Sequence, residues 1–332
     1  MTLFLGPAHL ERLNADGHVA MSDYVSAVEA AFAEHGRGEI GVVPRAVLAA
    51  DPSATTTRTR SLKLSASYLR GTKLIGASVY TALFRPGDVD MWLTLFSGET
   101  GRMLGIVHGK SVSLWKTAAT AAVATRHLAR SNSSHAALIG TGRYALHQAL
   151  ALAAVRPIRS IACAGRDTAH SHAFASRIRE ALPNIDVRVA ESVRVAIDGA
   201  DVATTITTAI EPIIEGQWLT AGVHMNVMGA HDPGEREVDT DGVLRSRVFV
   251  DADEQAFTEK GELLIPLAAG EMKRDHVAGE LGAVVSGRTI GRRAAKDVTM
   301  FLSGGTALEY TRICDMLIRR ASEVGIGQQL EV

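Results

Sequence analysis

The chain has 332 residues, of which 46% are hydrophobic and 21% are charged, and its formal net charge at pH 7 is −1. This length exceeds what one hydrophobic core of ordinary size holds, so it predicts two domains. The near-zero net charge differs from that of proteins that bind nucleic acid or an anionic membrane surface, and we expect neither partner.

Targeting signals and metal-binding patterns are not evident in the sequence. The first residues lack the basic region of a signal peptide, and the uncharged apolar runs fall short of the roughly 18 residues that span a membrane. Cys163 and Cys314 lie in separate apolar segments, which is typical neither of a disulfide framework nor of a zinc site. His170 and His172 are two residues apart on an expected helix, so they point to different faces. We therefore expect a reduced, cytoplasmic protein without a bound metal.

The first part of the chain reads as a mixed antiparallel α+β domain that ends near residue 112. Ser22 is a plausible N-cap for a helix that Gly36 ends, and a loop carrying Val43-Pro44-Arg45-Ala46 follows. Apolar and polar residues alternate over 60–68, the period of a half-buried strand. The further expected elements are strands over 73–79, 91–96 and 103–107, and an alanine-rich helix over 113–130.

The pattern changes after the polar linker at 131–134, where short apolar strands alternate with helices. Such alternation predicts a parallel sheet. The expected strands are 136–139, 158–163, 185–189, 202–205, 223–228 and 248–251, and helices are expected over 144–154 and 169–182. The run 297–303 is also strand-like, but we expect that it does not extend this sheet. A helix from Gly304-Gly305 to Glu323 is expected to fold back on the first domain.

A glycine turn opens the second domain, between its first strand and the helix that follows. Gly140 permits a tight turn, Gly142 lets backbone N–H groups approach a pyrophosphate, and Ala145 is small enough for close packing of helix and strand. The amino end of the helix then presents partial positive charge to the phosphates. In its strand and helix setting, the turn predicts a dinucleotide-binding site.

The residues after the second strand bear on which dinucleotide binds. An NAD-selective fold usually has an acidic residue there, which accepts hydrogen bonds from the ribose 2′-hydroxyl. Here the strand end lacks an acid, and Arg166 could pair with a 2′-phosphate. Asp167 is instead a candidate N-cap of the next helix. We therefore favour NADP and leave NAD possible.

Several separated segments together resemble the ornithine cyclodeaminase/mu-crystallin family. The matching runs, in the family's order, are Val43-Pro44-Arg45, 71–75, Thr100-Gly101, 116–119, 139–142, 229–239, 260–263 and 298–305. The resemblance implies a Rossmann-type doubly wound parallel sheet over 113–304. This domain is inserted into an α+β substrate-binding and dimerisation domain made of 1–112 and 305–332. Members include ornithine and lysine cyclodeaminases, alanine dehydrogenases, ketimine reductases and mu-crystallin, which binds NADPH.

The same resemblance implies how a small amino or imino acid is held. Arg45 and Lys73 match an arginine and a lysine that grip the substrate α-carboxylate, and Lys116 stands at the position of a second arginine. Lys73 is also a candidate catalytic residue. The residues expected to contact the coenzyme are Thr117, Gly140, Thr141, Gly142, Arg143, Tyr144, Arg166, Thr205, Thr207, Met228 and Ser303.

The sequence departs from the family pattern at several positions of the expected substrate site. Lys116 keeps the charge of the usual arginine but not its bidentate fork. Thr81 replaces an asparagine, and Asp88 stands where the cyclodeaminases have a threonine. Cyclodeaminases and related alanine dehydrogenases have an aspartate two residues before a proline of the 229–239 run, and here that position holds His231.

Loss of that aspartate favours a reductase, because a protonated imine needs no strong acid from the protein. We therefore expect an NAD(P)H-dependent reductase of a small imino acid, such as a pyrroline- or piperideine-2-carboxylate. His231 is a candidate proton donor, although it is equally well read as a partly buried, hydrogen-bonded histidine. The alternatives are a cyclodeaminase or amino acid dehydrogenase, with His231 or Asp232 as base, and a non-enzymatic NADPH-binding protein. Glu237 and Asp239 match family positions that we interpret as structural.

Overall fold

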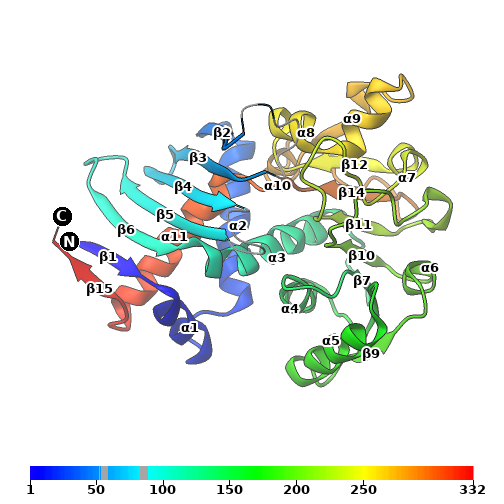
Figure 1. The fold of residues 1–332 in the computed structure, drawn as a ribbon, viewed down its shortest axis with the longest axis horizontal. Helices are drawn as coiled ribbons and strands as arrows, with labels where there is room; N and C mark the ends of the chain where they lie inside the picture. Colours follow the sequence, from blue (N-terminus) through cyan, green and yellow to red (C-terminus); the bar gives the residue numbers. More distant parts are fainter. Residues whose placement is uncertain (52, 54–58, 83–88, 332) are drawn as a thin grey trace. The chain divides into compact units, whose positions relative to one another are not determined.

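The computed structural model describes residues 1–51, 53, 59–82 and 89–331 (Figure 1). The chain forms two compact units: Met1–Lys116 with Gly305–Val332, and Thr117–Gly304. The first boundary therefore follows Lys116, inside helix α3 (Gly109–Leu128), and not residue 112. Asp88, one of the departures from the family pattern, lies outside the described residues.

The first unit contains a seven-stranded sheet whose order is β15-β1-β6-β5-β4-β3-β2. Its strands are β1 (Thr2–Leu5), β2 (Ile40–Ala49), β3 (Ser61–Leu69), β4 (Leu74–Ala82), β5 (Val89–Ser97), β6 (Met103–His108) and β15 (Gln328–Leu330). All neighbours are antiparallel except β1 and β6. The expected strands β3 to β6 are confirmed. The two terminal strands, β1 and β15, were not expected, and they pair with each other (Figure 1).

The expectation of a loop around Arg45 is wrong, because this segment is part of the edge strand β2. The β2–β3 register shifts between Val43 and Ala46, which marks a bulge around Pro44 and Arg45. Proline has no backbone N–H to donate, so within sheets it is confined to edges and bulges. The bulge therefore explains how the Pro-Arg pair fits in a strand.

Helices α1 (Pro7–Ala15), α2 (Met21–Gly36) and α11 (Ala307–Glu323) complete the first unit. The N-cap of α2 is Ala20 and not the expected Ser22, because the Asp23 carboxylate accepts a hydrogen bond from the Ala20 N–H at 2.8 Å. Helix α11 packs on β3, β4 and α2, and its Thr311 hydroxyl lies 2.7 Å from that of Ser67. The C-terminal helix thus returns to the first unit, as expected.

The second unit contains an eight-stranded, wholly parallel sheet whose order is β13-β12-β14-β11-β10-β7-β8-β9. Its strands are β7 (His135–Ile139), β8 (Ser160–Ala164), β9 (Asp186–Val189), β10 (Val202–Thr205), β11 (His224–Val227), β12 (Arg247–Val250), β13 (Val277–Glu280) and β14 (Thr299–Leu302). The run at 297–303 therefore does extend this sheet, between β11 and β12, which corrects the expectation. Strand β13 was missed because its sequence, Val-Ala-Gly-Glu, lacks a strand's apolar run.

Helices on the second unit follow the strands. They are α4 (Ala145–Val155), α5 (Thr168–Ala181), α6 (Val193–Ile197), α7 (Thr240–Arg245), α8 (Asp253–Glu259), α9 (Gly261–Ala268) and α10 (Leu281–Val285). The strands are rich in buried Ala, Val and Ile, which fits a sheet with both faces covered. Cys163 and Cys314 are both free and buried. Among the helices of the described part of the chain, none combines the length and the apolar character needed to cross a membrane.

Candidate functional site

The glycine turn joins β7 to α4 and adopts a conformation that only glycine tolerates well. Gly140 has φ of +102°, and a Cβ placed there would lie 2.5 Å from the carbonyl oxygen of Ile206. Gly142 differs, because a Cβ there would meet no atom within 4 Å. The first glycine is thus required by the fold itself, whereas open space at the second leaves room for a ligand against the backbone.

A pocket of about 460 Å³ lies beside this turn, at the carboxyl ends of the strands. Along the sheet, β7 separates β8 and β9 from β10 and β11, so the strand order reverses at this point. Open parallel sheets bind ligands at such a switch point. Five of the residues expected to contact the coenzyme line this pocket: Gly140, Thr141, Gly142, Arg166 and Thr207.

Arg166 and Asp167 have different roles in the structure. The Asp167 carboxylate caps α5 by accepting a hydrogen bond from the His170 N–H at 2.6 Å. Arg166 is exposed and lines the pocket. The imidazole Nε2 of His170 lies 2.9 Å from the Thr141 carbonyl oxygen, a contact that no sequence pattern predicts. The capping interpretation of Asp167 is therefore confirmed, and its carboxylate is engaged at the helix end.

The buried Glu237 carboxylate organises the strand ends on the other side of the pocket. It accepts hydrogen bonds from the Thr205 hydroxyl at 2.7 Å, from the Thr207 hydroxyl at 2.6 Å and from the Gly229 N–H at 2.7 Å. The structural interpretation of Glu237 agrees with these contacts. The hydroxyls of both threonines therefore face a protein carboxylate, and only Thr207 also lines the pocket. Asp239 is likewise structural, because it caps α7.

Met228 and Ser303 directly follow the neighbouring strands β11 and β14, and both are buried. The Ser303 hydroxyl donates to the Asp251 carboxylate at 2.9 Å. Beyond Met228 the chain reaches His231, which is exposed, so of its two interpretations the partly buried histidine is not the one observed. Asp232 is 7% exposed, and its carboxylate accepts a hydrogen bond from the Gly234 N–H at 3.2 Å.

Arg143 and Tyr144 lie in the glycine turn, with the guanidinium of Arg143 5.7 Å from the ring centre of Tyr144. Thr117 is half-buried on α3.

Two of the expected substrate-binding cations lie close to Gly305 in the first unit. The Arg45 guanidinium donates to the Gly305 carbonyl oxygen at 3.0 Å. A Cβ at residue 305 would lie 2.5 Å from Nζ of Lys116 and 3.9 Å from a terminal nitrogen of Arg45. Lys116 is 4% exposed and its ammonium lies 3.4 Å from the Glu309 carboxylate. This pair of cations is suited to an anionic group such as a carboxylate.

Lys73 does not join these two cations. It lies in the exposed turn between β3 and β4, where its ammonium pairs with Glu99 and this contact raises the pKa of Lys73. The bulge that contains Arg45 lies opposite Ser65, which pairs with Ser78 on β4. Ser78 is five residues beyond Lys73, a separation of about 16 Å along a strand. Thr81, the other departure on this strand, is half-buried near its end.

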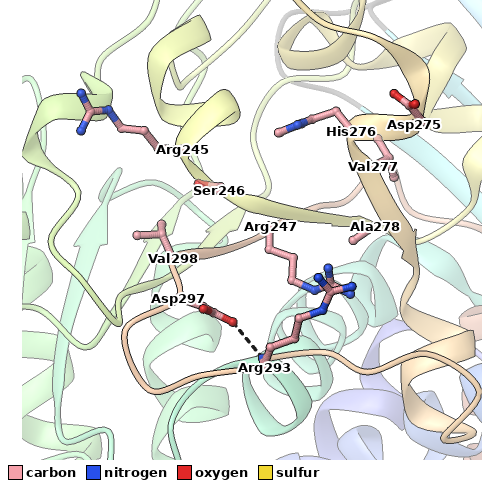
Figure 2. A pocket seen from close by; sticks show the side chains of 10 residues that line it. All are labelled: Arg245, Ser246, Arg247, Asp275, His276, Val277, Ala278, Arg293, Asp297 and Val298. Atoms are coloured by element: carbon pink, nitrogen blue, oxygen red, sulfur yellow. Dashed lines mark hydrogen bonds between the residues drawn. The ribbon is translucent and has the colours of Figure 1, made fainter.

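Figure 2 shows a second pocket, of about 640 Å³, at the amino ends of β12, β13 and β14. The expected site residues do not line it. Its Arg247 donates to the Gly291 carbonyl oxygen at 2.8 Å, and its Asp297 carboxylate accepts from the Arg293 backbone N–H at 2.8 Å. Ligands of open parallel sheets bind at the opposite, carboxyl ends of the strands. We therefore assign the candidate site to the pocket beside the glycine turn.

Comparison with known proteins gives consistent matches over nearly the whole chain. Residues 8–324 match the model of the ornithine cyclodeaminase/mu-crystallin family. Delta(1)-pyrroline-2-carboxylate reductase of Colwellia psychrerythraea is 34% identical over 216 residues, which are 65% of this chain and 68% of that one. The structure of Thermococcus litoralis Delta(1)-pyrroline-2-carboxylate reductase with NADH and L-proline has a TM-score of 0.90 and 28% identity, and the match covers 99% of this chain and 100% of that one. An archaeal alanine dehydrogenase dimer with bound NAD has a TM-score of 0.89 and 25% identity, covering 99% of each chain.

Proposed function

The chain belongs to the ornithine cyclodeaminase/mu-crystallin family, and we propose that it reduces a small cyclic imino acid, such as a pyrroline- or piperideine-2-carboxylate, with a nicotinamide coenzyme. The observation that carries this proposal is the likeness of the entire fold, both units included, to a Delta(1)-pyrroline-2-carboxylate reductase. The pocket beside the glycine turn supports binding of a dinucleotide. The cations around Gly305 support binding of a carboxylate.

Arg45 and Lys116 hold the substrate carboxylate in this proposal. Lys116 presents a point charge where the family usually has a bidentate guanidinium, so Arg45 supplies the planar fork. Anchoring the carboxylate fixes the neighbouring imine carbon, which is the atom that must be oriented for reaction. Lys73, paired with Glu99 in an exposed turn, has no part in this grip.

A bound reduced nicotinamide supplies the hydride that adds to the imine carbon. The imine nitrogen arrives protonated, so the C=N bond becomes a CH–NH bond without a strong acid from the protein. Because His231 is exposed and an imidazole can pass protons to and from water, it serves to exchange protons through water. Asp232 is buried and accepts a hydrogen bond from Gly234, which supports a structural role for its carboxylate.

We propose NADPH as the preferred coenzyme. The support comes from Arg166, which lines the pocket after β8, and from Asp167, whose carboxylate is committed to the α5 cap. A guanidinium at this position suits a 2′-phosphate, whereas NAD selectivity normally requires an acid there. The two solved relatives described above contain NADH and NAD, so coenzyme choice is a separate measurement from the reaction itself.

Amino acid oxidation is the second candidate, because an alanine dehydrogenase has nearly the same fold. That reaction must first remove a proton from a substrate ammonium group, so it needs a base near the amine. His231 occupies the position of the family's aspartate, and it would have to act as that base. We also propose a homodimer, supported by the dimeric state of that alanine dehydrogenase.

The decisive experiment is coenzyme consumption over a panel of imino acids. NADPH and NADH oxidation are measured with cyclic and linear imino acids, and ammonia release is measured in parallel from ornithine, lysine and alanine with NAD⁺ and NADP⁺. We expect reduction of a cyclic imino acid and no ammonia from the diamino acids. Ammonia release that is lost in His231→Ala would favour the second candidate. Tight NADPH binding without turnover of any compound would favour a binding protein.

A further inference from the structure

Lys260 is a wholly buried lysine between α8 and α9 that none of the reactions above uses. Its side chain is fully enclosed, and its ammonium donates to the carbonyl oxygens of Ala230, at 2.5 Å, and Ser303, at 3.2 Å. A buried cation is costly unless it is well hydrogen-bonded. Its placement therefore calls for an explanation beyond packing.

The two carbonyls belong to segments that carry residues expected to take part in the site. Ala230 directly precedes His231 and Asp232, and Ser303 directly follows β14. Strands β11 and β14 are hydrogen-bonded neighbours that end at Val227 and Leu302, and the Ser303 N–H still donates to the Val227 carbonyl oxygen at 3.2 Å. Lys260 thus links the segment that follows β11 to the end of β14, beyond the paired residues of the two strands.

The junction between α8 and α9 holds the same segment at further points. A Cβ at Gly261 would lie 2.1 Å from the Glu235 carbonyl oxygen, so the start of α9 touches the 233–235 turn directly. The Glu262 carboxylate accepts a hydrogen bond from the Glu237 N–H at 2.9 Å. Lys260 is the contact of this junction that lies nearest in sequence to His231. The junction as a whole therefore acts as a fixed support for residues 229–237.

We propose that Lys260 is a positioning residue, which fixes the Ala230–Asp232 segment relative to Ser303 and thereby places the His231 side chain for the proton exchange described above. The assignment rests on the proposed function for its catalytic consequence, but the ordering of the segment is independent of it. Lys260 contacts neither coenzyme nor substrate in this scheme. Its effect on the rate is exerted through the two carbonyls that it holds.

The test compares Lys260→Met, which keeps the length of the side chain but removes its donors, with Lys260→Arg and with Lys273→Met. Lys273 is exposed, so the last variant controls for loss of a lysine. We expect Lys260→Met to lower kcat about 10- to 100-fold, with KM and the coenzyme Kd changed by less than about 3-fold. Lys260→Arg should recover part of the rate, and Lys273→Met should match the wild type.

Hydrogen exchange separates this proposal from the proposed function. In Lys260→Met, amides of residues 229–235 should exchange at least about 10-fold faster, while those of β7 and β10 keep their protection. Unchanged exchange at 229–235, or faster exchange throughout the second unit, overturns the positioning role. A wild-type protein that reduces no imino acid would overturn the proposed function, and the exchange result would still decide whether Lys260 orders the segment.

Discussion

The ammonium of Lys116 lies 3.4 Å from the carboxylate of Glu309, and both side chains are buried. Glu309 also accepts hydrogen bonds from the backbone N–H and the hydroxyl of Thr306, the N-cap of α11. The cation expected to bind substrate thus also contacts a carboxylate that caps a helix. This contact bears on stability, and it is separate from the substrate-binding role that we propose for Lys116.

These roles can be separated with a double-mutant cycle. Lys116→Met removes the ammonium beside the buried Glu309 carboxylate, and we expect it to lower the free energy of unfolding by about 3–5 kcal/mol. Adding Glu309→Gln removes the charge of this carboxylate while keeping a capping acceptor, so the double variant should regain much of this loss. Its KM for the imino acid should nevertheless stay raised about 10-fold or more. Urea unfolding and steady-state kinetics give the two readouts, and a KM that recovers with stability would remove Lys116 from the substrate site.

For Lys73 we expect the opposite result, namely that its substitution has little effect on substrate turnover. Because it is exposed and pairs with Glu99 in the β3–β4 turn, we expect Lys73→Ala to change kcat/KM by less than about 3-fold. Arg45→Ala is the matched comparison, since Arg45 lies beside Gly305. Losing a charged carboxylate contact there should cost about 100-fold in kcat/KM. A loss of similar size in Lys73→Ala would show that this lysine reaches the substrate, as the family resemblance implies.

Local patterns in the sequence were sufficient for most of the fold. Short apolar runs predicted the strands from β7 to β12, and the glycine turn predicted the pocket, because both signals lie within a few residues. The central place of β14 could not be predicted in this way. It follows β11 by a long stretch of chain, and only the three-dimensional pairing with β11 and β12 identifies its neighbours.

In the candidate site, too, local features could be predicted from the sequence, whereas contacts between distant segments could not. The capping role of Asp167 could be assigned because helix capping depends on adjacent residues. The support of the site depends on distant contacts, such as the Glu237 carboxylate with Thr205 and the Lys260 ammonium with Ser303. The pairing of Lys73 with Glu99 was not expected for a related reason, since its sequence match says nothing of where the β3–β4 hairpin turns.

The glycine turn predicts contrasting effects of two alanine substitutions. Gly140→Ala introduces a side chain at φ of +102° and within 2.5 Å of the Ile206 carbonyl oxygen, so we expect it to lower the free energy of unfolding by about 1–3 kcal/mol. Gly142→Ala meets open space and should unfold like the wild type. It should instead weaken coenzyme binding about 10-fold or more, because the methyl group occupies the space for the pyrophosphate. Thermal unfolding and fluorescence titration with NADPH measure the two effects, and normal coenzyme binding by Gly142→Ala would exclude the phosphate site here.

Arg166 determines the coenzyme in our proposal. Arg166→Ala should weaken NADPH binding about 10- to 100-fold through loss of a charge-assisted contact to the 2′-phosphate, and NADH binding by less than about 3-fold. Arg177→Ala, an exposed change on α5, controls for the loss of a positive charge near the site. Titration of both coenzymes gives the ratio directly. Equal losses for NADPH and NADH would rule out a 2′-phosphate contact for Arg166.

Acid sensitivity should follow from His224, which is buried in β11 beside Thr299 and Asn226. Burial lowers the pKa of His224 to about 3, whereas the unfolded chain has a value near 6.5. Between these values the unfolded state binds the extra proton, so stability falls as the pH is lowered, by up to about 1.4 kcal/mol per pH unit. His224→Gln removes this contribution, and the difference in unfolding free energy between about pH 6 and pH 5 should shrink accordingly. His172→Gln, an exposed change, should keep the wild-type dependence, and an unaltered dependence in His224→Gln would mean that His224 is not held neutral in the folded protein.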